Sequence, residues 1–236
     1  MKILNLEQGT KEWQDARMAK VTGTKSEAVM GTSQARTTLV AELIAEEATE
    51  MSKAHVSSAE MERGTAEEIF AIRAFEKQTG KKVDRIGMCI HETMDWVTLS
   101  PDGLIKNSEG KYTEAVEVKC PDSKKAILYK IHNQMPMEET GLMGVKGPLA
   151  GAPFLGIPAD YKWQVVHYFV VNEDLERLHF VVYDERFIGE EMKLYIVTVE
   201  RKNEILQEAI AKELESLESF REYWQKCREV VLTTDF

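Results

Sequence analysis

SPDGLIKNSEGKYTEAVEVKC, which spans residues 100–120, predicts a β-hairpin that carries charged side chains. A tight turn is indicated at residues 107–110, where Asn-Ser-Glu-Gly separates two apolar runs. Residues 115–119 then alternate in polarity, so a strand would point Glu117 and Lys119 to one face and the two valines to the other. The hairpin would bring Asp102, which lies between a proline and a glycine, beside Glu117.

Paired acids of this kind favour a metal site. Two carboxylates about 5 Å apart repel by about 3 kcal/mol at an effective dielectric constant near 20. A divalent cation removes that repulsion, and carboxylate oxygens suit Mg²⁺ or Mn²⁺. Lys119 would then orient a water or a phosphate oxygen. A solvated hairpin face is the alternative, because an acid two residues before a lysine also occurs at Glu109, Asp122, Asp160, Glu191 and Glu200.

Composition indicates a globular protein of 236 residues, with 43% hydrophobic and 30% charged residues. We expect one domain over residues 1–236. The 3 cysteines form no C-x-x-C pair, which favours a reducing cytosol. The sequence shows neither a signal-peptide pattern nor an apolar run of 18 residues, so we expect a cytoplasmic protein without a membrane segment. A net charge of −10 argues against holding nucleic acid by bulk attraction.

The order of predicted elements gives an α/β fold. Residues 161–171 are so apolar that a buried helix and a strand both remain open, and residues 133–160 form a long connection. The other predicted helices cover residues 34–51, 61–79, 123–131 and about 203–227, and the other strands cover residues 83–90, 96–99, 178–183 and 193–199.

Several polar residues outside the hairpin allow two interpretations. Residues 20–25 combine hydroxyl and basic side chains before a short predicted helix, which suits either phosphate binding or ordinary capping. Arg17 either complements a helix dipole or binds an anion. Glu67 and Glu68 are favoured in any first helical turn, and Gln164 could be a satisfied core group.

Four segments, taken together and in this order, resemble a known family. They are QGTKEWQDARMAKVTGTK from Gln8, RGTAEE from Arg63, SPDG followed by EVKCP, and YKWQ from Tyr161. The chain resembles the phage lambda-type exonucleases, the YqaJ-like viral recombinase family within the PD-(D/E)XK nuclease superfamily. The resemblance implies a mixed central sheet flanked by helices, with a C-terminal helix from about residue 203.

The resemblance also implies roles for individual residues. In the active centre, Asp102, Glu117 and the backbone carbonyl of Val118 would hold Mg²⁺, with Mn²⁺ as an alternative, and Glu92 falls where an aspartate approaches the metal. Lys119 matches the catalytic lysine, Glu68 a supporting helix acid, and Gln164 a glutamine near that lysine. On the DNA side, Arg17, Thr24 and Ser100 fall in the pocket for a 5′-phosphate, and Met61 lies near the duplex–single-strand junction. Lys20, Lys25 and Arg63 would line the DNA channel.

The implied function is Mg²⁺-dependent digestion of one strand of linear duplex DNA from its 5′ end. The remaining 3′ strand would serve phage-type recombination in the host bacterial cytosol, beside a single-strand annealing protein. Such enzymes form a homotrimeric ring around DNA. Three alternatives remain: an endonuclease of the same superfamily, a non-catalytic DNA-binding or structural descendant, and a glycosidase with paired carboxylates. Retention of Asp102, Glu117 and Lys119 together counts against the second, and nothing else resembles a sugar cleft.

Overall fold

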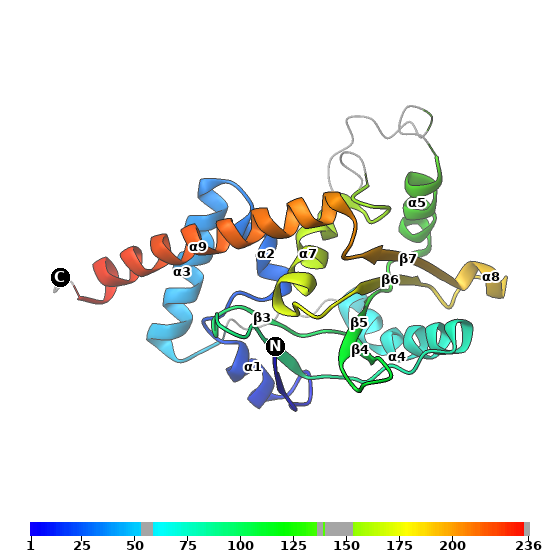
Figure 1. The fold of residues 1–236 in the computed structure, drawn as a ribbon, viewed down its shortest axis with the longest axis horizontal. Coiled ribbons are helices and arrows are strands. Elements are labelled where there is room, and N and C mark those ends of the chain that lie inside the picture. The colour runs from blue at the N-terminus through cyan, green and yellow to red at the C-terminus, as the bar shows by residue number, and fades with distance from the viewer. Residues whose placement is uncertain (53–58, 136–138, 140–152, 234–236) are drawn as a thin grey trace.

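Two β-sheets form the framework of the computed structural model, which describes residues 1–52, 59–135, 139 and 153–233 (Figure 1). The first sheet is antiparallel and consists of β1 (Lys2–Leu4), β2 (Met88–Ile90) and β3 (Thr98–Leu99). The second has the order β4-β5-β6-β7, formed by Gly103–Lys106, Tyr112–Lys119, Arg177–Tyr183 and Leu194–Glu200. Only β5 and β6 are parallel within it, so the sheet is mixed, as predicted.

The predicted hairpin is confirmed as β4 and β5, joined by a tight turn. The side-chain oxygen of Asn107 accepts hydrogen bonds from the N–H groups of Glu109 and Lys111, both at 3.0 Å. Gly110 adopts a φ of 81°, a conformation that glycine reaches without steric cost. Gly103 pairs with Val116, which places Asp102 at the end of β4 nearest to Glu117.

The helices differ from the prediction mainly at their ends. Residues 161–171, where a helix and a strand both remained open, contain the helix α7, and the C-terminal helix runs past residue 227. Of the predicted strand 83–90, only Met88–Ile90 is a strand, while Asp84 forms an isolated bridge with Leu104. The α-helices are α1 (Lys11–Arg17), α2 (Ser26–Val29), α3 (Ser33–Thr49), α4 (Ala59–Thr79), α5 (Ser123–Gln134), α7 (Lys162–Val171), α8 (Glu190–Lys193) and α9 (Glu204–Thr233), with 3-10 turns at Gly23–Lys25 (η1) and Ala159–Tyr161 (η2).

Helices cover both faces of the four-stranded sheet. On one face, Val116 and Val118 of β5 join a buried apolar cluster with Ala71 and Phe75 of α4. On the other face lies α7, which α9 covers in turn before crossing α3 (Figure 1). Because α7 lies between the sheet and α9, it is predominantly apolar, and every residue from 165 to 171 is buried.

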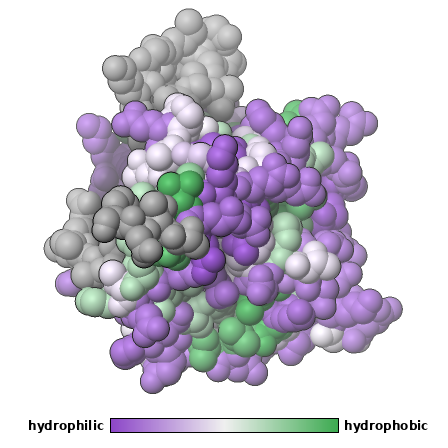
Figure 2. Space-filling view, turned by 90° about the vertical axis from the view of Figure 1, so that its left-hand side faces the viewer, coloured by the Kyte–Doolittle hydropathy of each residue, from purple (hydrophilic) through white to green (hydrophobic). Residues whose placement is uncertain are grey.

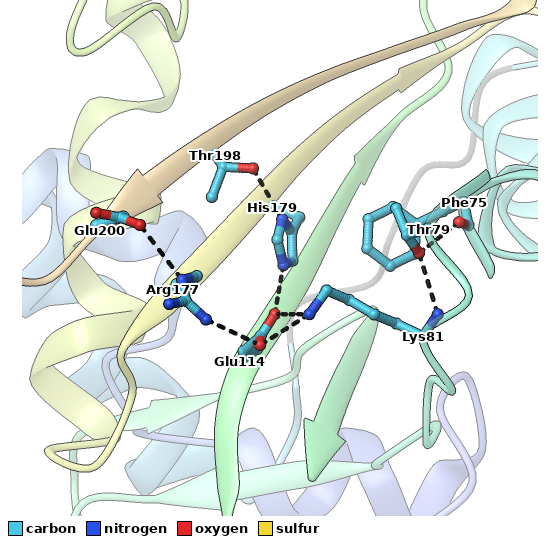
Figure 3. A network of polar contacts seen from close by, with 8 residues as sticks. All are labelled: Phe75, Thr79, Lys81, Glu114, Arg177, His179, Thr198 and Glu200. Carbon is cyan, nitrogen blue, oxygen red and sulfur yellow. Dashed lines mark hydrogen bonds and ion pairs between the residues drawn. The ribbon is translucent and has the colours of Figure 1, made fainter. Parts of the chain in front are cut away.

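A polar network ties the amino-terminal half of β5 to α4, on the valine face of the sheet (Figure 3). Glu114 accepts hydrogen bonds from Lys81 at 2.9 Å, from Arg177 at 3.3 Å and from Nε2 of His179 at 2.7 Å. The His179 ring also lies 5.1 Å from the ring of Phe75 in α4. The network therefore balances one buried carboxylate with several cationic or polar groups, away from Glu117 at the other end of the strand.

The surface at the end where α9 terminates is mostly hydrophilic, with small separate apolar groups (Figure 2). In the described part of the chain, none of the helices combines the length and the apolar character that crossing a bilayer requires.

Candidate active site

Asp102 lies one residue before β4, beside the part of β5 that β4 does not reach. Val116 pairs with Gly103, the first residue of β4, so Val118 faces the same edge two residues farther on. There the N–H of Val118 donates a hydrogen bond to Oδ2 of Asp102 at 2.6 Å. Because the N–H and C=O of one strand residue face the same neighbour, the carbonyl of Val118 also faces this edge.

Glu117 is the centre of a second set of contacts and is only 2% exposed. Its Oε1 accepts hydrogen bonds from Nζ of Lys119 at 2.5 Å and from Nε2 of Gln164 at 2.6 Å. The hydroxyl of Tyr168 donates to Oε2. The other end of the Gln164 amide accepts a 3.3 Å hydrogen bond from Lys119. The side chains of α7 thus fix both the acid and the lysine of β5.

The charges in this cluster shift one another. Burial raises the pKa of Asp102 well above its ordinary value, and the negative charges of Glu117 and Glu68 raise it further. Burial also lowers the pKa of Lys119, but the carboxylates of Glu117 and Asp102 outweigh that effect, and the pKa is raised overall. Burial raises the pKa of the Tyr168 hydroxyl, which therefore stays protonated and remains a donor.

One cavity of about 240 Å³ opens onto this cluster and brings together the two groups of residues that the sequence assigned separately. The acids, the lysine and the glutamine form one part of its wall, and the predicted phosphate-binding residues form another. It is lined by Gln8, Trp13, Arg17, Thr22, Gly23, Thr24, Leu99, Ser100, Asp102, Glu117, Val118, Lys119 and Gln164.

The guanidinium of Arg17 is held in this cavity by an aromatic ring. Its Cζ lies 4.0 Å from the centroid of the Trp13 ring. The indole N–H of Trp13 donates to Oγ of Ser100 at 3.1 Å, and the Thr22 and Thr24 hydroxyls lie 3.2 Å apart. Burial lowers the pKa of Arg17, but a guanidinium remains protonated in proteins. The cavity therefore contains a positive charge beside a cluster of hydroxyl groups, which suits an anion.

Other predicted site residues lie outside the cavity wall. Glu68 accepts a 2.8 Å hydrogen bond from Arg85, and burial raises the pKa of Glu68, with Glu117 adding to the rise. It therefore lies near the cluster without lining the cavity. The structure does not bring Glu92 to the cluster, because its carboxylate pairs with the N-terminal amine at 3.2 Å. Met61 belongs to α4, but its side chain lies outside the described residues.

The three cations assigned to a DNA channel each have partners within the protein. Lys25 pairs with Glu42 at 3.2 Å and with Glu46 at 3.3 Å. Lys20 donates to the backbone carbonyl of residue 95 at 3.1 Å. Arg63 donates to the carbonyl of Cys120 at 3.1 Å, directly after β5. The charge of Lys25 is thus compensated, and Arg63 supports the end of β5.

Three polar or aromatic residues of the site were not assigned from sequence. Gln8 and Trp13 lie in the segment QGTKEWQ, and the resemblance of this segment to the family could have indicated that they belong to the site. Their side chains form hydrogen bonds with residues 86–101. The side-chain amide of Gln8 donates to the carbonyls of Ile86 and Pro101, both at 2.9 Å. Tyr168 follows Gln164 by four residues, which places both side chains on one face of a helix. This spacing could have indicated Tyr168 only if residues 161–171 had been recognised as a helix.

The oxygen donors at this edge fit a small hard cation. Among the described residues, no three His, Cys, Asp or Glu side chains gather as a metal-binding group. The donors are instead two carboxylates, Asp102 and Glu117, with the carbonyl of Val118. Mg²⁺ is commonly bound through one or two carboxylates while it keeps several waters. The chemistry of this donor set therefore suits Mg²⁺ without a contribution from Glu92.

Sequence comparison assigns the chain to a family. The model of the YqaJ-like viral recombinase domain matches residues 12–174, which include the whole cavity wall except Gln8. The chain belongs to this family. No match was found among curated proteins.

Solved structures agree with this assignment. The chain is similar to an alkaline exonuclease, LHK-Exo, from Laribacter hongkongensis, with 25% identity and a TM-score of 0.74, covering 95% of this chain and 97% of that chain. LHK-Exo in complex with dAMP gives 25% identity and a TM-score of 0.70, covering 95% and 99%. A phage related exonuclease from Haemophilus somnus 129PT shares the fold at 16% identity and a TM-score of 0.56, covering 89% and 96%.

Proposed function

We propose that this YqaJ-family protein is a Mg²⁺-dependent exonuclease that digests one strand of linear duplex DNA from its 5′ end. The observation that carries the proposal is that a single cavity contains both the acid–lysine cluster and the Arg17 anion site. A terminal phosphate bound at one part of the wall would lie beside a phosphodiester at the other. The similarity to an alkaline exonuclease supports the same activity.

The chain's own groups suggest a division of roles. Asp102, Glu117 and the Val118 carbonyl would hold Mg²⁺, which when bound polarises the phosphodiester and lowers the pKa of a water. Lys119, with its raised pKa, stays protonated, so it acts as a hydrogen-bond donor to a phosphate oxygen and does not accept a proton. Gln164 holds that lysine in place.

The end-binding part of the cavity would select the substrate. Arg17 can make a bidentate, charge-assisted contact with a terminal phosphate that lysine does not reproduce. We therefore expect a 5′-phosphoryl duplex to be digested faster than a 5′-hydroxyl duplex, and Arg17→Lys to reduce the difference. Lys11→Ala is the control, since Lys11 is exposed and pairs with Asp15 on the same helix.

The test of the activity uses linear duplexes labelled at the 5′ or 3′ end, incubated with Mg²⁺ or with EDTA, and a closed circular duplex. We expect release of 5′ nucleotides from the linear DNA only with Mg²⁺. Lys119→Ala should lower the rate by about 100-fold or more. Lys202→Ala is its matched control, because Lys202 belongs to another acid-x-Lys triplet and is 84% exposed. Cutting of the closed circle would instead favour an endonuclease of the same superfamily.

The biological setting is proposed by analogy with the phage exonucleases that the chain resembles. We infer that the remaining 3′ strand is passed to a phage-type single-strand annealing protein in the bacterial cytosol. We also infer a homotrimeric ring, which would retain DNA by topology because a chain of net charge −10 does not retain it by bulk attraction. Light scattering gives the mass, and competitor DNA added after the start tests processivity. A monomer that competitor stops at once would contradict the ring.

A further inference from the structure

The helix α7, which carries Gln164, has no capping side chain of its own. Tyr161 occupies its N-cap position and makes no side-chain hydrogen bond to the helix, and its first turn contains no acid. The first backbone N–H groups of a helix need acceptors, and a negative charge is favoured beside them. Glu27 of α2, 136 residues away in the chain, supplies one: its Oε1 accepts a hydrogen bond from the N–H of Trp163 at 3.0 Å.

The segment that precedes Glu27 lies against the same turn of α7. A Cβ built on Gly23 would lie 3.6 Å from Cγ of Gln164 and 3.9 Å from Cδ2 of His167, within ordinary van der Waals contact, so this backbone packs close to α7. The hydroxyl of Ser26 donates to the carbonyl of Gly23 at 2.6 Å and fixes the turn that contains Thr24. The anion-binding segment, Gly23–Lys25, and the helix α2 that follows it thus meet α7 at two points, Gly23 and Glu27.

The position of Glu27 carries an electrostatic cost. Burial raises the pKa of Glu27, and the charges of Asp160 and Glu213 raise it further, while the hydrogen bond from Trp163 opposes the rise. The contact with α7 is therefore the principal interaction that offsets the burial of this carboxylate.

We propose that Glu27 is a positioning residue that joins the anion-binding segment, Gly23–Lys25, to the first turn of α7, so that Gln164 moves together with the terminal-phosphate pocket. The inference rests on the proposed exonuclease function. Trp163 immediately precedes Gln164, whose amide contacts both Glu117 and Lys119. Occupation of the phosphate pocket thereby orders the amide that holds the catalytic lysine.

Three substitutions separate the geometry of this contact from its charge. Glu27→Ala removes the acceptor, Glu27→Asp keeps the charge but shortens the side chain, and Glu27→Gln keeps the reach and an oxygen acceptor. We expect kcat on a 5′-phosphoryl duplex to fall about 10- to 100-fold in Glu27→Ala, since misplacement by about 1 Å has an effect of that order. Glu27→Asp should fall in the same direction, and Glu27→Gln should stay within about 3-fold of the wild type.

The 5′-phosphoryl to 5′-hydroxyl rate ratio gives a readout that a general loss of stability does not change. It should approach 1 in Glu27→Ala and Glu27→Asp and remain unchanged in Glu27→Gln. Asn203→Ala is the matched control, because Asn203 caps α9 by accepting from the N–H of Ile205 at 3.0 Å. It should lower stability while leaving kcat and the ratio of the two rates unchanged.

Hydrogen exchange adds a measurement that does not depend on cleavage. In Glu27→Ala, or in Glu27→Asp if the alanine variant does not fold, amides of Gly23–Lys25 and of the first turn of α7 should exchange faster together. Wild-type kcat and end preference in Glu27→Asp, or faster exchange in only one of the two segments, would overturn the inference. A wild type that cleaves no DNA would count against the proposed function alone, since the exchange measurement still tests the coupling.

Discussion

Replacing Glu114 by alanine should destabilise the protein by about 2–4 kcal/mol without affecting the site. The side chain of His179 is only 7% exposed and would lose the partner of its Nε2, and an unsatisfied buried polar group costs about 1–3 kcal/mol. The side chains of Lys81 and Arg177 are 33% and 42% exposed, so water can replace Glu114, and each lost pair costs at most about 1 kcal/mol.

The assay is urea unfolding followed by circular dichroism at neutral pH. Glu200→Ala is the matched control, because Glu200 pairs with the exposed side chains of Arg177 and Lys202, and its loss should cost less than about 1 kcal/mol. Nuclease activity per folded molecule should be unchanged in both, since Glu114 and Glu117 lie on opposite faces of β5. A loss below about 1 kcal/mol in Glu114→Ala, or one equal to the control, would refute the reasoning.

The same network predicts sensitivity to acid. Burial alone would raise the pKa of Glu114, but hydrogen bonds from His179 and Lys81 outweigh it, and the pKa is lowered. A carboxyl group whose folded-state pKa is depressed contributes stability above its unfolded-state pKa, and that contribution is lost as the pH falls through the folded-state value. Unfolding free energy should therefore decrease from about pH 4.5 downward in the wild type, and less steeply in Glu114→Gln.

Three further predictions concern the site and its support. Because the pKa of Asp102 is raised, protons compete with Mg²⁺ for this carboxylate. Calorimetry should therefore show that the affinity for Mg²⁺ rises with pH and that Mg²⁺ binding releases protons. Asp102→Asn should reduce that proton release. Nζ of Lys119 lies 4.8 Å from the centroid of the Tyr161 ring, so Tyr161→Leu should lower kcat several-fold, by about 1 kcal/mol of activation free energy, whereas Tyr161→Phe should not. A Cβ on Gly103 would lie 2.1 Å from Cγ1 of Val83, so Gly103→Ala should cost about 1–3 kcal/mol by urea unfolding, whereas Gly64→Ala, with nothing within 4 Å, should not destabilise α4.

The hairpin was predictable because its determinants are local. The turn residues, the alternation in residues 115–119 and the position of Asp102 all lie within the single segment 100–120, and the side-chain period of a strand fixes which of them share a face. The resemblance of four short segments then indicated that Arg17, Thr24 and Ser100 belong to the same site, and the structure does place them in one cavity with Glu117.

Long-range partners were not predictable from the same patterns. Nothing in the local sequence specified that β6 pairs parallel with β5, or that Lys25 pairs with Glu42 and Glu46. Residues 161–171 remained ambiguous because a helix buried on all sides lacks the periodicity that distinguishes it from a strand. The contact of Tyr168 with Glu117 could be inferred only when residues 161–171 were known to form the helix α7.

The two halves of the site close chain loops of very different length. Val118 reaches Asp102 across 16 residues, whereas Gln164 reaches Glu117 across 47. Because closure entropy grows with the logarithm of loop length, the longer loop costs about 1 kcal/mol more. Contacts of high sequence separation also form slowly. We therefore expect the acidic hairpin to close early in folding, and the amide of Gln164 to reach Glu117 later.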